Sequence, residues 1–211
     1  MAEGTHRANL SIHHLLAAAH FSRHVSEIEH SHAGEPFGEF FEEVLWFSSA
    51  CVLSSVAGLE AYANELFVDR SQHFTDLRAE IIDKLWELFE QKPTLEKFDM
   101  ALLLKKKPLL NRGCRPTQDV AALVALRNGL IHFKPEWDDE KAVHARISQQ
   151  LTHRFKPSPF LSDPEWIFPR RWATHGCTAW AVESSVAFLS EFESISGVPS
   201  KLAKFIERLK G

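Results

Sequence analysis

An arginine, an asparagine and a histidine lie close together in the stretch LRNGLIHF, residues 126–133. The guanidinium of Arg127 is planar and permanently charged, and its fork of donors matches the oxygens of a phosphate. The imidazole of His132 titrates near neutral pH, so it can take up or release a proton. The stretch therefore combines a phosphate ligand with a proton carrier, and Asn128 directly follows the arginine.

Such a pair suits cleavage of an RNA strand without a metal ion. In that reaction the ribose 2′-hydroxyl loses its proton and attacks the adjacent phosphorus, and the 5′-oxygen leaves. His132 also stands at the end of a predicted helix, where the helix dipole favours the imidazolium. The chemistry requires that both side chains reach the same phosphate.

The helix that must position these residues is predicted over 118–133. Thr117 is expected to be its N-cap, and Pro135 disfavours helical geometry at Lys134 and should stop it. On an ideal helix Arg127 falls in the middle of the apolar face, roughly 140° around the axis from His132. The two side chains therefore do not meet on an ideal helix alone.

Two arrangements would bring them together. The helix can loosen at Gly129, or it can end at His132 ahead of the proline. Alternatively, a second copy of the chain can pack along a ridge of small residues and bring its own arginine and histidine into a shared cleft. That ridge, which Asn128 and His132 flank, consists of Ala121, Ala125 and Gly129.

Both site residues also have a purely structural interpretation. Arg127 can pair across the bundle with Glu60, the exception in an otherwise apolar or small stretch from Val44 to Ala63. A buried ion pair of this kind contributes to specificity of folding without doing chemistry. His132 can simply cap the end of its helix.

The rest of the chain predicts an all-α protein. Apolar residues recur at helical spacing, while the period-two alternation of strands never persists. We expect an antiparallel helical bundle with a long central helix over 37–69 and a proline- and aromatic-rich loop near 156–172 that lies against it. Trp166 and Trp172 in this loop can stack on nucleic-acid bases or simply anchor the loop. Further helices are predicted over 9–31, 75–91, 95–106, 138–154, 174–196 and 200–210.

Composition limits the class of protein. A chain of 211 residues that is 45% hydrophobic suits one compact domain or two small ones packed closely together, and we expect a single domain spanning 1–211. Three widely spaced cysteines indicate reduced thiols in a cytoplasmic protein, and we recognise neither an export signal nor a membrane-spanning run. The net charge of −4 argues against coating of nucleic acid by bulk charge. The window from Lys97 to Lys134 nevertheless holds eight basic and two acidic residues, which a solvated lysine run would also explain.

Twelve histidines suggest a metal site, but their spacing argues against one. His13 and His20 lie on one stripe of the first helix, roughly 10 Å apart along its axis, too far to share one zinc ion. His20 and His24 are one turn apart, but no third ligand has the accompanying spacing. We therefore predict neither a metal nor another cofactor.

The string LRNGLIHF resembles the R-N-x-x-x-H form of the R-x4-6-H signature of the HEPN superfamily. These all-α domains include metal-independent endoribonucleases and non-catalytic members. The match covers Arg127, Asn128 and His132. Upstream, GLEAYANEL at 58–66 is similar to the acidic helix that often precedes the motif, and WAVESSVAFLSEF at 180–192 is similar to the closing helix of such domains.

This resemblance implies a HEPN-like domain that forms a homodimer with both motifs facing one cleft and RNA as substrate. Arg127 would stabilise phosphate charge, His132 would carry a proton or bind phosphate, and Asn128 would orient the scissile group. The expected function is that of a metal-independent endoribonuclease, with a role as toxin or defence module that would add an antitoxin protein to the partners. The alternative is a non-catalytic HEPN-like helical domain that binds a partner protein or a nucleotide.

Overall fold

The computed structural model describes residues 8–137, 142–161 and 166–210, and in these residues it contains helices and no strands. The predicted all-α class and helical bundle are therefore confirmed. The longer helices are α1 (Ser11–Ser31), α2 (Phe40–Val68), α4 (Ala79–Phe89), α5 (Thr94–Leu104), α6 (Arg115–Ile131), α7 (Ala142–Leu151) and α8 (His175–Ser196). Short turns of helix form α3 (Arg70–His73), η1 (Ile167–Arg171) and α9 (Ile206–Leu209).

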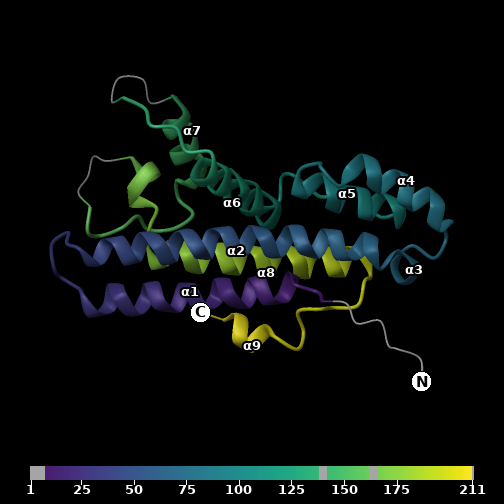
Figure 1. Cartoon of the computed structure of the whole chain (residues 1–211), viewed down its shortest axis with the longest axis horizontal. Coiled ribbons are helices and arrows are strands. Elements are labelled where there is room, and N and C mark those ends of the chain that lie inside the picture. Colours follow the sequence, from purple (N-terminus) through teal and green to yellow (C-terminus); the bar gives the residue numbers. More distant parts are fainter. Residues whose placement is uncertain (1–7, 138–141, 162–165, 211) are drawn as a thin grey trace.

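Two layers of helices make up the bundle (Figure 1). Helices α1, α2 and α8 pack against one another in the first layer. Helix α1 runs antiparallel to α2, whereas α8 runs in the same direction as α2 (Figure 1). Helices α5 and α6 cover this layer, and α6 contacts both α2 and α8. The three segments that carry the family resemblance therefore come from three helices that touch one another.

The predicted central helix is α2, which packs against α1, α5, α6 and α8. By length and composition alone α2 would also qualify as a membrane span, contrary to our expectation that the chain has no such segment. In this fold, 44% of its most apolar window is buried inside the molecule. The helix thus supplies the middle of one continuous apolar core.

Helix α6 begins earlier than predicted. Cys114 is extended, the helix starts at Arg115, and Pro116 lies in the first turn, where its missing N–H costs no hydrogen bond. Thr117 lies inside the helix and is buried, so its assignment as N-cap is wrong. The far end agrees with the prediction, because α6 stops at Ile131, shortly before Pro135.

Other helix boundaries also differ from the predictions. The segment predicted as a helix over 200–210 is helical only in α9, and α3 was not expected. Of the helix predicted over 138–154, residues 142–151 form α7, and residues 138–141 lie outside the described part. The loop near 156–172 lies against the bundle as expected, with Phe168 and Trp172 fully buried, while its residues 162–165 are not described.

Candidate functional site

Arg127 projects from α6 toward α2. Its guanidinium donates a hydrogen bond to the carboxylate of Glu60, which also accepts one from the hydroxyl of Thr94 at 3.1 Å. The exposed fractions of the two side chains are 19% for Arg127 and 40% for Glu60. The ion pair considered from the sequence is therefore present, but solvent reaches it.

Lys97 lies close to the same carboxylate. Burial lowers the pKa of Lys97, and the negative charges of Glu60 and Glu90 act in the opposite direction. The ammonium donates a hydrogen bond to the side chain of Asn64 at 3.1 Å. The face of α6 that carries Arg127 therefore meets a polar cluster between α2 and α5.

His132 and Asn128 lie on another side of α6, at a pocket of about 350 Å³ between α6, α7 and η1. Arg127 does not line this pocket. His132 is exposed and is the residue at which α6 ends, and its N–H still donates to the carbonyl of Asn128 at 2.9 Å. The pocket is lined by Ala125, Asn128, Gly129, His132, Lys134, Val143, His144, Arg146, Ile147, Gln150 and Phe168.

The predicted triad is therefore only partly assembled within one chain. One arrangement considered from the sequence was a helix that ends at His132, and α6 does end there, with His132 as its C-cap. This ending does not bring the imidazole to the guanidinium, because the two side chains stay on different sides of α6. Gly129 is helical and does not loosen the helix.

Gly129 instead allows a close approach by the same chain. A Cβ at this position would lie 2.6 Å from Cδ1 of Ile147 and 3.3 Å from Cζ of Phe168. The ridge of small residues is thus occupied at Gly129 by α7 and η1. A second copy cannot approach the backbone there, although Ala121 at the other end of the ridge is exposed.

The segment that follows His132 is held against α7. The carboxylate of Glu136 accepts the N–H groups of His144 and Val143, each at 3.0 Å, and so caps the start of α7. These hydrogen bonds, that from His144 first, hold the pKa of Glu136 below its ordinary value. The capping interaction ties the segment that follows His132 to the α7 wall of the pocket.

His144 of α7 also contacts this segment, from the interior of the protein. It is buried, and its Nε2 donates a hydrogen bond to the carbonyl of Lys134 at 3.0 Å. Its ring stacks on Phe133 with ring centres 5.5 Å apart and meets Phe168 edge-on at 5.1 Å. His144 therefore holds Phe133 and Lys134, the two residues that follow His132, and so positions the chain next to the exposed imidazole.

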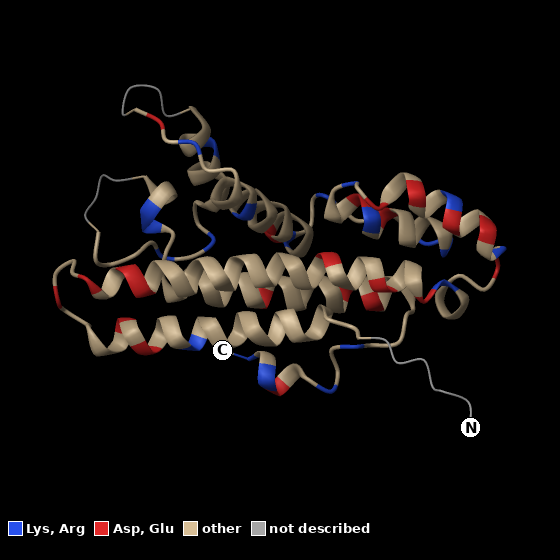
Figure 2. Ribbon diagram, in the orientation of Figure 1, with Lys and Arg blue, Asp and Glu red and all other residues tan. Residues whose placement is uncertain are grey.

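The pocket has a basic lining. Among the described residues that line it, Lys134 and Arg146 are the two Lys or Arg side chains, and none is Asp or Glu. Neither cation forms an ion pair with the described part of the chain. Figure 2 colours no residue of α7 as acidic, while several residues of α2, α4 and α5 are coloured as acidic. The carboxylate of Glu136 lies behind this lining, on the N–H groups of Val143 and His144. Within the described residues, a phosphate in the pocket would meet the two cations beside His132.

Sequence reasoning missed the contribution of α7. Val143, Arg146 and Gln150 recur at helical spacing and so share one face, which the sequence does reveal. What the sequence did not reveal is that this face turns toward His132. The signal available was Gly129, which marks a position where another segment approaches closely.

The histidines of α1 and the three cysteines form no further site in the described residues. In the described residues no group of three or more His, Cys, Asp or Glu side chains is placed to hold a metal ion. The Nε2 atoms of His20 and His24 do lie 3.2 Å apart, and Nδ1 of His24 contacts Glu27 at 3.1 Å. The three cysteines are free, and burial raises the pKa of Cys51 to about 12, which keeps this thiol protonated.

The two tryptophans of the 156–172 loop have different environments. Trp172 is buried and its indole N–H donates to the carbonyl of Pro169 at 2.8 Å, so it anchors the loop. Trp166 is 46% exposed. Comparison with known proteins adds no relative to this picture, because no family model, no curated protein and no solved structure matches the chain.

Proposed function

We propose that the protein is a metal-independent endoribonuclease that acts at the pocket between α6 and α7. One observation supports the proposal: Asn128 and His132 of the R-N-x-x-x-H motif share an open pocket whose described lining includes Lys134 and Arg146 and no Asp or Glu. A polyanionic substrate fits such a lining, and an exposed imidazole can exchange protons with it.

The proposed reaction uses residues of the pocket. His132 accepts the proton of the ribose 2′-hydroxyl, whose oxygen forms a bond to the adjacent phosphorus. The bond from phosphorus to the 5′-oxygen breaks, and this oxygen leaves with a proton from water, so the products are a 2′,3′-cyclic phosphate and a 5′-hydroxyl. Asn128 orients the phosphate through its amide, and Lys134 and Arg146 stabilise the charge that develops on it.

Arg127 joins this site only through a second copy of the chain. The proposal therefore includes a homodimer in which the arginine of one protomer serves the pocket of the other. Two apolar side chains next to the motif, Ile131 and Phe133, are 53% and 48% exposed. A contiguous exposed apolar patch is typical of an interaction surface, and these two side chains would have to contribute to such a patch. Cytoplasmic location and a toxin or defence role, with its antitoxin partner, stay predictions from the sequence.

The test is cleavage of diverse RNAs by the purified protein in excess chelator. We expect His132→Ala to lower the cleavage rate about 10²- to 10⁴-fold, the usual contribution of a proton carrier. His13→Ala, which removes an exposed histidine of α1, is the matched control and should cleave normally. Full activity in His132→Ala would reject the assignment.

A mixed-protomer experiment tests the homodimer. If the site is shared, mixing inactive Arg127→Ala with inactive His132→Ala protein restores about a quarter of the activity, because half the dimers gain one intact site. If each site lies within one protomer, mixing restores nothing. Size measurements on both variants check that dimers form.

A non-catalytic binding domain is the second candidate. The observation in its favour is that Arg127 is held by Glu60, outside the pocket of its own protomer. This candidate predicts RNA or nucleotide binding at the basic pocket with no cleavage of any RNA. Binding weakened by Lys134→Ala, in the absence of cleavage, would favour it over the nuclease.

A further inference from the structure

A second hollow lies on the opposite side of α7. It has a volume of about 640 Å³. It is lined by Ala142, Ala145, Arg146, Ser148, Gln149, Thr152, Trp166 and Ile167. Arg146 lines both hollows, so it lies at the boundary between them.

Helical spacing explains this shared position. Val143, Ile147 and Gln150 follow one stripe of α7 and face the pocket of His132. The residues of the second hollow follow another stripe, and Arg146 lies between the two stripes on a helix of about 100° per residue. A phosphate that binds Arg146 could therefore lie in the pocket that His132 lines and at the edge of the second hollow.

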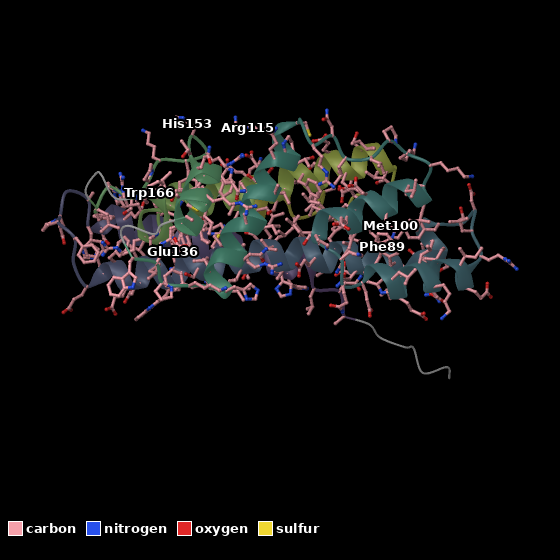
Figure 3. All side chains as sticks on the ribbon, turned by 90° about the horizontal axis from the view of Figure 1, so that it is seen from above. Phe89, Met100, Arg115, Glu136, His153 and Trp166 are labelled. Atoms are coloured by element: carbon pink, nitrogen blue, oxygen red, sulfur yellow. The ribbon has the colours of Figure 1, made fainter. Side chains whose placement is uncertain are left out.

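The second hollow offers groups that recognise a nucleobase. Trp166, from the segment preceding η1, presents a ring that is 46% exposed, and aromatic rings bind unpaired bases by stacking. The side chain of Gln149 is exposed and has an amide donor and acceptor for a base edge. Figure 3 labels Trp166 and Glu136, the cap of α7, at the same end of the molecule.

We propose that the second hollow binds the nucleobase adjacent to the phosphate that Arg146 holds. The inference rests on the proposed function for the identity of the ligand as RNA. Its consequence is that the substrate is unpaired at this position, because a base inside a duplex is stacked on its neighbours and cannot stack on Trp166. The base contact then selects where along a strand the phosphate is presented to His132.

Binding of adenosine 5′-monophosphate and of ribose 5-phosphate tests the subsite. Both ligands carry the same sugar and phosphate, so their affinity ratio, measured by calorimetry on the full chain, isolates the contribution of the base. We expect adenosine 5′-monophosphate to bind about tenfold more tightly, as stacking on one aromatic ring commonly gives. Trp166→Ala should abolish this preference, and Trp166→Phe should retain part of it.

Two further variants complete the design. Trp137 is 80% exposed and lines neither hollow, so Trp137→Ala should keep the preference. Arg146→Ala should weaken both ligands alike, because it removes the phosphate contact and leaves the base contact. Circular dichroism checks that each variant is folded.

The results separate this inference from the proposed function. Equal binding of the two ligands by the unmodified protein, or an unchanged preference in Trp166→Ala, overturns the base subsite even if RNA is cleaved. A preference that depends on Trp166, in a protein that cleaves no RNA, supports the subsite and rejects the nuclease. Both the subsite and the nuclease are supported if the unmodified protein cleaves RNA only in unpaired regions and Trp166→Ala cleaves more slowly than it at low substrate concentration.

Discussion

The guanidinium of Arg127 lies between α6 and α2, where Glu60 neutralises its charge. Burying this arginine on the apolar face of a helix requires such a partner, since an unpaired charge there would lose its hydration. Both side chains keep contact with solvent, which weakens the attraction between them. The pair therefore fixes the position of the guanidinium more than it stabilises the fold.

A double-mutant cycle measures the pair. We expect Arg127→Ala and Glu60→Gln each to lower the free energy of unfolding by about 1 kcal/mol, with a coupling energy of roughly 0.5–1 kcal/mol, because the pair is partly exposed. Urea unfolding provides the values. A coupling above about 3 kcal/mol would instead identify a dry structural ion pair, as in the purely structural interpretation of this arginine.

At the scale of elements, α7 and η1 complete the pocket by packing on α6 at Gly129. The absence of a side chain there lets Ile147 and Phe168 approach the backbone of α6. Glu136 and His144 then hold the connection from His132 to α7. The position of the imidazole is thus set by contacts between helices rather than by α6 alone.

Replacing Gly129 with alanine tests this packing. The added methyl overlaps Cδ1 of Ile147, and overpacking of this kind costs about 1–3 kcal/mol, partly offset by about 1 kcal/mol of better helix propensity. We expect a net loss of about 1 kcal/mol in Gly129→Ala by urea unfolding. Ile147→Val removes Cδ1 and should restore stability in the double variant. A more stable single variant would show that α7 moves away freely.

For the whole molecule, Glu65 joins parts of the chain that are far apart in sequence. Its carboxylate accepts the N–H and hydroxyl of Ser11, at 2.9 and 2.8 Å, and the ammonium of Lys201 at 2.8 Å. The backbone N–H of Lys201 also donates to Glu193, which accepts the hydroxyl of Tyr62. This buried network fastens the start of α1 and the segment after α8 onto α2.

The network predicts a pH dependence of stability. Burial opposes ionisation of Glu65, but the hydrogen bonds from Lys201 and Ser11 outweigh it and hold the pKa below the ordinary 4.5. A carboxyl with a lowered pKa in the folded state stabilises the protein above about pH 4.5, and this contribution is lost as the pH falls through the folded-state value. Glu65→Gln should therefore cost about 2 kcal/mol at pH 7, because Lys201 loses its partner.

Urea unfolding at pH 7, 5 and 3 checks this prediction. The difference between Glu65→Gln and the unmodified protein should stay constant from pH 7 to 5 and shrink at pH 3. Glu27→Gln, which alters an exposed carboxylate on α1, is the control and should differ little at any of the three values. A difference that grows on acidification would contradict the assigned direction of the pKa shift.

The features that the sequence determined by itself were local ones, set by residues close together in the chain. The recurrence of apolar residues predicted most helices, and Pro135 predicted the end of α6 near His132. The position of Arg127 on an apolar face gave its pairing with Glu60 as one of two interpretations. Tertiary structure alone decided that α7 packs at Gly129, that Arg146 joins Asn128 and His132, and that Arg127 stays outside their pocket. The physical reason is that helical periodicity depends on neighbouring residues, whereas the face a helix turns toward a site depends on side-chain packing between segments far apart in the chain.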